Sequence, residues 1–541
     1  MKPNRESRAL ATGRGTEAPL AMIDLNERLH WWLFAAAYLL AVLVTIWSRW
    51  HGPLNHDVSW LMVAAERWLD GARYGSGIVE INTPAAMLLY SPAVWLGRLS
   101  GLPASHLVDL SLALVALWAA VLVGRSTSQI AGASALSRRA LVSSTLVYAV
   151  LAFYPADDFA QRDHFVAALL LPYAVIRMGA PQGSCRRLDQ VAAAISVALA
   201  LCIKPQYLVI LAVILVVSLR RHMRQCRNSR QAWLETLWSS DLPLIVAIGL
   251  LYIGLVYFAF PDWLAMVWRL KVLYGIYSSP FLQVAGGTVI YMIPMAIVAT
   301  ALCFPLPERG YLRDGLLLAV AVVLLVFVER KPWSYHFLPI MLFLGTGAVL
   351  TFVGSLPALA RLSSHPAAIG LAVALIPIVL VAQSGQANYT HRKILDSALL
   401  APNLRPLAKK GDSIAALSIG IPPFFPLVTE EGYRWALRYP CLWPLAGAVA
   451  LRASGDFNDE KMQAVVQDLG TAIAQDIDHD RPSVVLVDYR PFVPQFPDGV
   501  DLLAMLLRNA DFTDQWRHYR LQRVVGGIAI YNRTDISGQA G

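Results

Sequence analysis

The sequence predicts an all-α polytopic membrane bundle of about eleven transmembrane helices, followed by a small carboxy-terminal α/β domain. Of the 541 residues, 57% are hydrophobic and 15% charged, a balance too apolar for an ordinary soluble domain. Several runs reach the roughly 17–25 residues that cross a bilayer as a helix, and they do not alternate with polar residues as barrel strands do. After about residue 384 the composition becomes that of a soluble domain.

Hydropathy and charge together fix the predicted spans. Arginines gather in alternate loops between the apolar runs, and the positive-inside rule places those loops in the cytoplasm. A crossing at 84–98 would invert all of these loops, so this broken segment is predicted not to cross. The amino terminus is then inside, the carboxy terminus outside, and the spans are 31–49, 105–124, 138–153, 164–178, 189–203, 205–219, 242–260, 284–304, 314–328, 336–353 and 366–384.

The first outer loop, about 50–104, is long and carries two predicted interfacial helices. Asn55-His56-Asp57 follows the first span by a few residues, and the run after it places apolar residues on one helical face. An acidic residue at the edge of a bilayer is a candidate catalytic base. The structural alternative is that Asp57, Asn55 or Ser59 caps the following helix.

The two ends of the chain are predicted to lie on opposite sides of the membrane. Residues 1–30 form a polar tail that we expect in the cytoplasm before a retained first span, residues 31–384 form the membrane part, and residues 385–541 form the outer domain. In that domain, strand-like runs alternate with helical patterns. The strand-like runs are Ser413–Ile419, Ser483–Tyr489 and Val524–Tyr531, and the helical patterns lie near 388–400, 459–477 and 500–510.

The net charge of +9 does not require nucleic acid as a partner. The basic residues lie mainly in short loops, where the membrane topology explains them. Five cysteines lack CxxC spacing and mostly lie in or beside apolar segments, so they predict neither a zinc site nor a disulfide framework. The partner that the composition does require is the lipid bilayer.

Acidic and basic side chains meet at the outer face of the predicted bundle. Charges at the edge of the hydrocarbon persist where they face a cavity, a partner or a ligand, so both signs at one face indicate a charged substrate. A phosphate group needs cations or hydrogen-bond donors around it. The candidates for that role are Lys204, Arg162, Arg330, Lys331 and His336.

These candidates also have structural alternatives. Lys204 fits a lysine that extends from a helix end to the interface. Asp157 and Asp158 fit a solvated turn before the next helix. The segment 333–336 fits the aromatic belt of a membrane interface, so the functional interpretation depends on the convergence of these residues.

Several short segments and their placement carry a resemblance to a known superfamily. An aspartate follows the first span, a second acidic position lies in the next outer loop, and an outer domain ends the chain. With this architecture the sequence resembles the GT-C superfamily of integral-membrane glycosyltransferases, which includes dolichyl-phosphate mannosyltransferases and aminoarabinose transferases. The matching segments are Asn55-His56-Asp57, Glu80-Ile81-Asn82-Thr83-Pro84, Gln161-Arg162-Asp163-His164, Lys204-Pro205 and Trp333-Ser334-Tyr335-His336.

The resemblance implies transfer of a sugar from a polyprenyl-phosphate donor to a cell-envelope glycan or lipid, usually with inversion. The reaction would take place on the periplasmic side of a bacterial inner membrane. Asp57 is then the implied general base, and Asp157 or Asp158 matches the second acidic position. The implied substrate-binding residues are His56, Glu80, Asn82, Trp333 and Tyr335.

Metal dependence varies within the superfamily. Asp57 with Asp157 or Asp158 offers oxygen ligands for a divalent ion, but the basic outer residues can neutralise a phosphate instead. We therefore expect no obligatory metal or other cofactor. The carboxy-terminal domain lacks a WWD-type acceptor motif, which argues against a protein asparagine as the acceptor.

Two other classes of protein fit parts of the pattern. A transporter or flippase of lipid-linked sugars often has inverted repeats and discontinuous midplane helices, whereas no repeat is evident and the charges gather at one face. An O-antigen-polymerase-like enzyme would have a large outer loop between late spans. Four aromatic residues of the outer domain fit sugar stacking or simple packing: Tyr433, Trp435, Tyr439 and Trp443.

Overall fold

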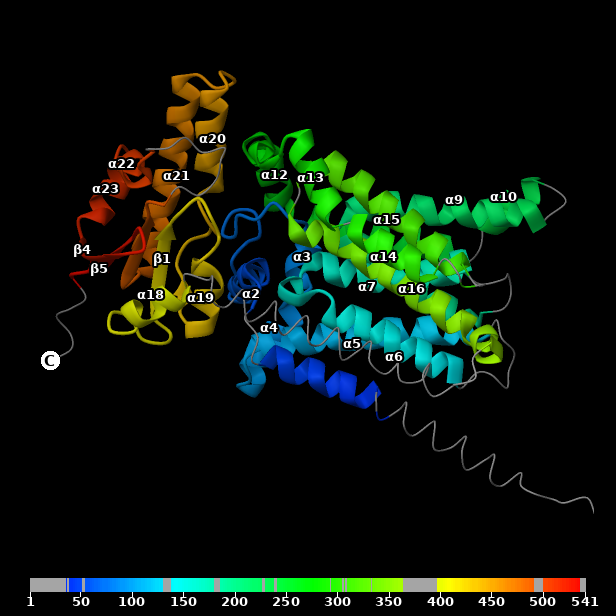
Figure 1. The fold of residues 1–541 in the computed structure, drawn as a ribbon. Coiled ribbons are helices and arrows are strands. Elements are labelled where there is room, and N and C mark those ends of the chain that lie inside the picture. The colour runs from blue at the N-terminus through cyan, green and yellow to red at the C-terminus, as the bar shows by residue number, and fades with distance from the viewer. Residues whose placement is uncertain are drawn as a thin grey trace, which may run out of the picture.

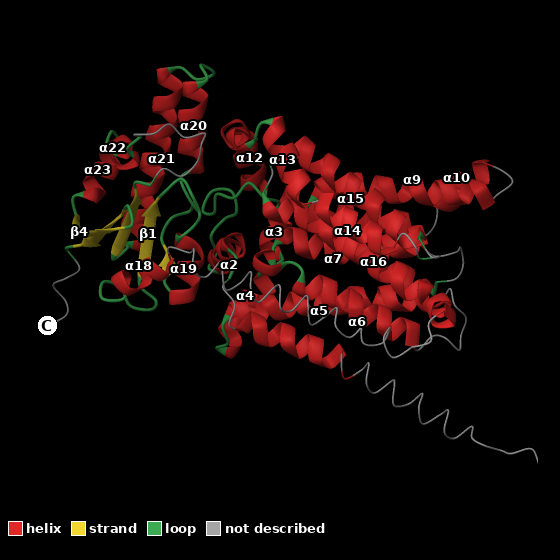
Figure 2. Cartoon of the chain, viewed as in Figure 1, coloured by secondary structure: helices red, strands yellow, loops and turns green. Residues whose placement is uncertain are grey.

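The structure is a computed structural model, and Figures 1 and 2 show a helical bundle beside a smaller part that contains a sheet. The predicted tail 1–30 and the predicted span 366–384 lie outside the described residues. The described residues are 36, 38–50, 54–129, 138–179, 185–225, 229–237, 241–291, 293–303, 306, 309–331, 333–362, 397–490 and 500–535.

The bundle begins with an apolar helix at Tyr38–Trp50. Short 3-10 turns, Ala156–Asp158 and Pro205–Tyr207, lie before α7 and α9. The α-helices that follow the first are α2 His56–Leu69, α3 Pro84–Leu88, α4 Ser91–Ser100, α5 Ala104–Gln129, α6 Arg138–Phe153, α7 Arg162–Ala174, α8 Arg187–Ile203, α9 Leu208–Gln225, α10 Ser229–Leu237, α11 Asp241–Ala259, α12 Pro261–Tyr274, α13 Phe281–Tyr291, α14 Ile293–Cys303, α15 Gly310–Glu329 and α16 Ser334–Leu362.

Five helices of the described part are long and apolar enough to cross a membrane. The prediction of about eleven spans is therefore not confirmed. One reason is that several predicted spans form shorter helices, as at α6, and that the predicted span 284–304 contains two helices, α13 and α14. The five candidate spans are Ala104–Thr127, Pro205–Arg224, Asp241–Ala259, Gly310–Glu329 and Ser334–Leu356.

Close packing holds α7 and the pair α15 and α16 in the bundle. Every residue of α7 is buried, including the charged residues of its first turn. Gly315 and Gly347 let α15 and α16 approach, because a Cβ at Gly315 would lie 2.7 Å from the carbonyl oxygen of Phe343. Small residues at such contacts allow the backbones of apolar helices to touch.

The amphipathic helix α2 lies between the bundle and the carboxy-terminal part (Figure 1). The sequence predicts an interfacial helix here, but residues 58–65 are all buried in a core shared with the carboxy-terminal part. The Ser59 hydroxyl lies 2.8 Å from the Thr429 hydroxyl, and Arg67 donates a 2.8 Å hydrogen bond to the Trp435 carbonyl. The apolar face of α2 is thus covered by protein.

The carboxy-terminal part contains a five-stranded sheet in the order β2-β1-β3-β5-β4. Strands β2, β1 and β3 are parallel, and β5 pairs antiparallel with both β3 and β4. The strands are β1 Ser413–Leu417, β2 Arg434–Trp435, β3 Val484–Asp488, β4 Tyr519–Val525 and β5 Ile528–Arg533, and the helices are α18 Ser397–Leu404, α19 Phe424–Glu431, α20 Trp443–Ala453, α21 Asp459–Asp480, α22 Leu502–Leu506 and α23 Ala510–Trp516.

Two predicted elements of this part divide into two. The run Val524–Tyr531 was predicted as one strand but contains the turn of the β4–β5 hairpin, because Gly526 and Gly527 adopt φ values of 56° and 82°. Glycine reaches such values at little cost, and two such residues form a tight hairpin turn. The helical pattern near 500–510 similarly gives α22 and the start of α23.

Candidate active site

A cavity of about 540 Å³ lies where the bundle meets the carboxy-terminal part. Helix α2, the loop before α3 and the starts of α7 and α16 form one side. The loop after β1 and the start of α20 form another. Seven of the residues predicted for the site line this cavity: His56, Asp57, Glu80, Asn82, Arg162, Trp333 and Tyr335.

Asp57 is in the first turn of α2, and Asn55 is the capping residue. The Asn55 side-chain oxygen accepts a 2.9 Å hydrogen bond from the backbone N–H of Asp57. Because Asn55 already caps the helix, the Asp57 carboxylate is free to face the cavity. The partial positive charge of the helix start also favours a carboxylate at this position.

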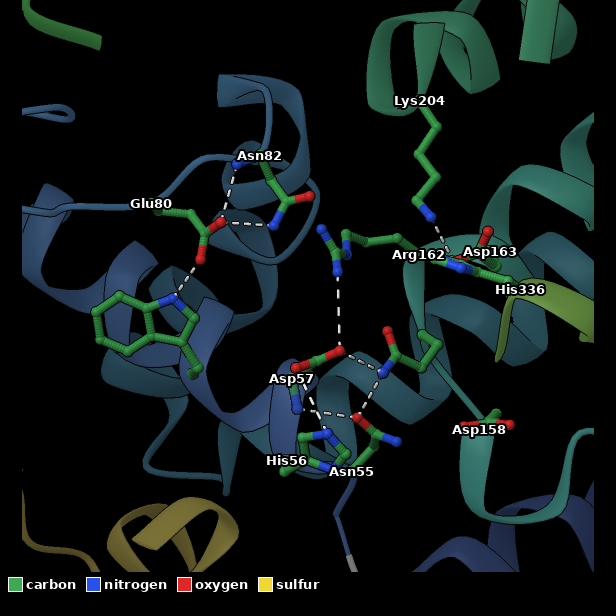
Figure 3. Close-up of polar contacts among 12 residues, drawn as sticks. Asn55, His56, Asp57, Glu80, Asn82, Asp158, Arg162, Asp163, Lys204 and His336 are labelled. Carbon is green, nitrogen blue, oxygen red and sulfur yellow. Dashed lines mark hydrogen bonds and ion pairs between the residues drawn. The ribbon is translucent and has the colours of Figure 1, made fainter. Parts of the chain in front are cut away.

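Three neighbours stabilise the Asp57 carboxylate, whose side chain is 13% exposed (Figure 3). Gln161 donates a 3.0 Å hydrogen bond to it, and Nη2 of Arg162 lies 3.8 Å away. His56 Nε2 lies 3.6 Å from the other carboxylate oxygen. Burial alone would raise the pKa of Asp57, but the charges of His56 and Arg162 and the Gln161 hydrogen bond outweigh burial and lower it.

Arg162 brings an available cation to the cavity. It begins α7 and is 5% exposed. Its Nε and Nη1 atoms have no hydrogen-bond partner among the described residues. A buried guanidinium with unused donors is costly unless a ligand or water takes them up, and its planar geometry suits a phosphate or a carboxylate.

Glu80 and Asn82 form another polar part of the wall (Figure 3). The Glu80 carboxylate accepts hydrogen bonds from Trp60 Nε1 at 2.6 Å and from the Asn82 backbone at 2.9 Å and side chain at 2.5 Å. The Glu80 carbonyl accepts a further bond from Trp263 Nε1 at 3.2 Å. These contacts fix the loop, so the orientation of Glu80 is set before any ligand binds.

Lys204 does not line the cavity. Its Nζ donates a 2.6 Å hydrogen bond to the buried carboxylate of Asp163, which also accepts a 2.7 Å bond from the Tyr207 hydroxyl. The lysine thus neutralises a neighbouring acid inside the wall. His336 is also predicted as a phosphate ligand, but its Nδ1 atom is hydrogen-bonded to the Lys331 carbonyl oxygen at 2.7 Å.

Lys331 lies behind the aromatic side of the cavity. Its Nζ is 3.9 Å from the ring centroid of Tyr274 and 5.4 Å from that of Trp333, and both rings line the cavity. Burial, together with the charges of Lys204 and Arg162, lowers the pKa of Lys331 to about 8. Arg330 does not line the cavity, and its Nε donates to the Ser279 carbonyl at 3.2 Å.

The acidic pair of the second outer loop also lies outside the cavity lining. Asp158 accepts a 3.3 Å hydrogen bond from the Ser334 hydroxyl, and Figure 3 places it apart from Arg162. Burial, with the charges of Asp157 and other acids, raises the pKa of Asp158 to about 7. The described residues contain no group of three or more His, Cys, Asp or Glu side chains that could hold a metal ion.

Sequence reasoning missed several residues of the site. Gln161 connects Asn55 and Asp57, with Nε2 2.8 Å from the Asn55 oxygen. Its position just before α7 marks it only as a helix-start residue. The wall residues Tyr274, Tyr277, Ile419, Gly420, Ile421, Pro422 and Cys441 have no local sequence signal. Of the four aromatic residues singled out in the carboxy-terminal part, Trp443 lines the cavity.

No model of a known protein family matches the sequence, and no curated protein matches it. Solved structures do. The apo structure of ArnT from Cupriavidus metallidurans is 14% identical to this chain in sequence, with a TM-score of 0.54. The match covers 94% of this chain and 98% of the ArnT chain. The structure of ArnT bound to undecaprenyl phosphate has 13% identity and a TM-score of 0.52, over 92% and 97% of the two chains.

At this identity the likeness concerns the fold, and it extends over nearly the whole of both chains. The chain therefore shares the fold of ArnT.

Proposed function

We propose that this protein is a glycosyltransferase of the bacterial inner membrane that uses a polyprenyl-phosphate sugar as its donor. The acceptor would be a glycan or lipid of the cell envelope on the periplasmic side. The observation that carries the proposal is the pairing of Asp57 with Arg162 in one cavity, where two nitrogens of Arg162 have no partner among the described residues. ArnT, which shares the fold, has been solved with undecaprenyl phosphate bound.

The two side chains fit opposite requirements of sugar transfer. In the proposed step, the oxygen of the acceptor hydroxyl forms a bond to the anomeric carbon, and Asp57 takes the hydroxyl proton. The bond between that carbon and the phosphate oxygen breaks, and its electron pair leaves with the phosphate. Arg162 stabilises the charge of the departing phosphate. Attack opposite the phosphate inverts the configuration of the sugar.

The remaining walls suit the other parts of such substrates. Tyr274, Tyr277, Trp333 and Trp443 offer apolar ring faces, which stack on sugars. Glu80 offers a carboxylate held by three donors, a fixed acceptor for sugar hydroxyls. We propose the same orientation for the whole chain as the sequence predicts, with the carboxy-terminal domain in the periplasm, and no obligatory metal.

The first test is binding of undecaprenyl phosphate to the purified full-length protein, measured by native mass spectrometry. Arg162→Gln should weaken binding by about tenfold or more, since a charge-assisted hydrogen bond contributes roughly 1.5–3 kcal/mol. Arg162→Lys should restore part of the affinity. The matched control is Arg405→Gln, because Arg405 is exposed and paired with Glu431 at 2.8 Å. Equal binding by all four proteins would contradict the proposal.

The second test separates a transferase from a transporter or flippase of lipid-linked sugars. The protein is placed in vesicles with a panel of radiolabelled undecaprenyl-phosphate sugars and an envelope extract. A transferase releases undecaprenyl phosphate and moves the label to an acceptor. Movement of intact donor across the vesicle membrane, without cleavage of the sugar–phosphate bond, would support the transporter instead.

A further inference from the structure

A second groove, of about 930 Å³, lies between the first helix, α2, α4, the start of α5 and the carboxy-terminal part. Helix α2 separates it from the active-site cavity. His56, Asp57 and Trp60 face the cavity, whereas Met62 and Glu66 face the groove. The proposed sugar transfer makes no use of this groove.

The groove lies at the depth of lipid headgroups. Arg49 and Trp50, at the end of the first apolar helix, and His106, at the start of a candidate membrane span, line it together. The ends of apolar helices mark the surface of the hydrocarbon, where tryptophan is favoured. Large apolar side chains beside the groove are exposed: Trp47 68%, Trp50 51%, Trp95 51%, Leu99 66% and Leu102 50%. Exposed apolar side chains of this size beside the groove fit contact with the bilayer.

Arg49 is a buried cation in this groove whose N–H groups donate no hydrogen bond to a described residue. It is 6% exposed, and its guanidinium lies 4.5 Å from the ring centroid of Phe159. No hydrogen bond or ion pair of Arg49 occurs within the described part of the chain, although the charges of Asp109 and Asp157 act on it. An arginine buried at the edge of the hydrocarbon persists where it meets a partner or a ligand.

Most other charges of the groove already have partners. Arg98 binds Asp70 through two hydrogen bonds of 2.7 and 3.0 Å. Glu431 accepts two from Arg405, at 2.9 and 2.8 Å. Glu66 lies 3.7 Å from Arg98, and Arg434 lies 3.2 Å from Asp480. Glu430 accepts a 3.4 Å hydrogen bond from the Leu54 backbone, and Lys410 is exposed.

Asp109 is the acidic counterpart of Arg49. It lines the groove on the first turns of α5 and is half-buried, and it too has no hydrogen bond or ion pair with another described residue. A ligand that satisfies both side chains must present an anion to Arg49 and a cation with N–H donors to Asp109. The start of α5 adds a partial positive charge near the anion.

We infer that this groove binds the headgroup of a membrane lipid that carries a phosphate beside a primary ammonium, as phosphatidylethanolamine does. The phosphate contacts Arg49, and the ammonium donates to Asp109. Trp50 stacks on His106 with ring centroids 3.9 Å apart and forms a rigid side of the groove toward the bilayer. The inference does not depend on the proposed transferase activity.

The experiment compares lipids on the purified full-length protein by native mass spectrometry in detergent. Phosphatidylethanolamine should remain bound about tenfold more tightly than phosphatidylcholine, whose quaternary nitrogen has no N–H donor. Arg49→Gln should lower phosphatidylethanolamine binding by about tenfold. The wild type should also prefer phosphatidylethanolamine to phosphatidylglycerol, which has no ammonium, and Asp109→Asn should remove this preference. The matched control is Arg98→Gln, in the same groove but paired with Asp70, which should bind as the wild type does.

The outcomes separate a built site from lipid that merely coats the protein. Equal binding of the three lipids by the wild type would overturn the inference, as would unchanged binding by Arg49→Gln. If that variant does not fold, the wild-type comparison of phosphatidylethanolamine with phosphatidylcholine decides the question alone. Loss of binding with Arg49→Gln and loss of selectivity with Asp109→Asn would establish the two contacts.

Discussion

The side-chain oxygen of Asn55 accepts a 2.9 Å hydrogen bond from the backbone N–H of Asp57, so the two residues have different roles at the start of α2. Asn55 satisfies the helix terminus, and Asp57 keeps its carboxylate for the cavity. A capping aspartate would have spent its oxygens on backbone N–H groups of its own helix. The division makes the role of each residue testable by substitution.

Asp57→Asn should abolish sugar transfer while leaving the fold and lipid binding intact. The amide matches the shape of the carboxylate but does not take up a proton, and loss of a general base costs about 10²–10⁴-fold in rate. Transfer is measured as release of undecaprenyl phosphate from the donor, and binding by native mass spectrometry. A variant that transfers at the wild-type rate would remove Asp57 as the base.

Asn55→Ala should lower both stability and transfer. Loss of a capping residue costs about 0.5–2 kcal/mol, and Gln161 also loses the oxygen that holds it beside Asp57. Asn458→Ala is the matched control, because Asn458 caps α21 through the Lys461 N–H at 2.9 Å, away from the cavity. Thermal unfolding should show a loss in both variants, and only Asn55→Ala should slow transfer. Equal transfer by the two variants would contradict this division.

Affinity for undecaprenyl phosphate should fall as pH rises through about 8. The Lys331 ammonium, whose pKa is lowered to about 8, loses its charge there, with an effect on the order of threefold for a charge that does not touch the phosphate. Lys331→Arg should remove the dependence, since arginine stays charged. Binding is measured between pH 6.5 and 9.5, and the same decline in the variant would exclude Lys331 as its source.

Deprotonation of Lys331 should lower lipid affinity as pH rises, but its effect on the stability of the fold should have the opposite sign. The unfolded chain holds this proton up to its ordinary pKa of 10.5, whereas the folded chain releases it near pH 8. The unfolded state therefore binds more protons between these values, and the free energy of unfolding should rise with pH across that window. Lys331→Met should lose this rise in a denaturation series. A rise that persists in Lys331→Met would assign it to another group.

Asp158→Asn should change how stability varies below pH 7. The pKa of Asp158 is raised from 3.8 to about 7, so the folded chain holds this proton longer than the unfolded chain does. The resulting stabilisation is complete below pH 4 and is lost as pH rises through about 7. The uncharged variant should lack that loss. The difference in stability between variant and wild type should therefore be more favourable to the variant at pH 8 than at pH 4. Thermal unfolding at the two values measures the difference, and a constant offset would contradict the assignment.

The sequence was informative where a residue's surroundings are unusual for its type. Asp57, Arg162 and Glu80 are charged residues beside apolar segments, and such positions indicate a cavity or a ligand whatever the fold. All three line the cavity. The same reasoning did not separate Lys204 from Arg162, because the partner of Lys204 is Asp163 on the neighbouring helix α7, and that pairing depends on how α7 and α8 pack.

The aromatic and carboxy-terminal walls of the cavity could not be predicted from the sequence, because they too depend on how distant helices pack. Tyr274 and Trp443 meet with ring centroids 5.5 Å apart, although they come from distant parts of the chain. Gly447 allows this approach, since a Cβ there would collide with the Leu273 carbonyl oxygen. An isolated glycine in an apolar helix has many uses, and only the neighbouring helix shows which one applies.

The loop after β1, residues 419–422, lines the same cavity as α2, although the two are far apart in the sequence. A chain that ends after the bundle therefore contains Asp57 and Arg162 but lacks the residues of the carboxy-terminal part that enclose them. Under the proposed transfer, a truncation that removes the last quarter of the chain should be inactive, because the cavity lacks this wall.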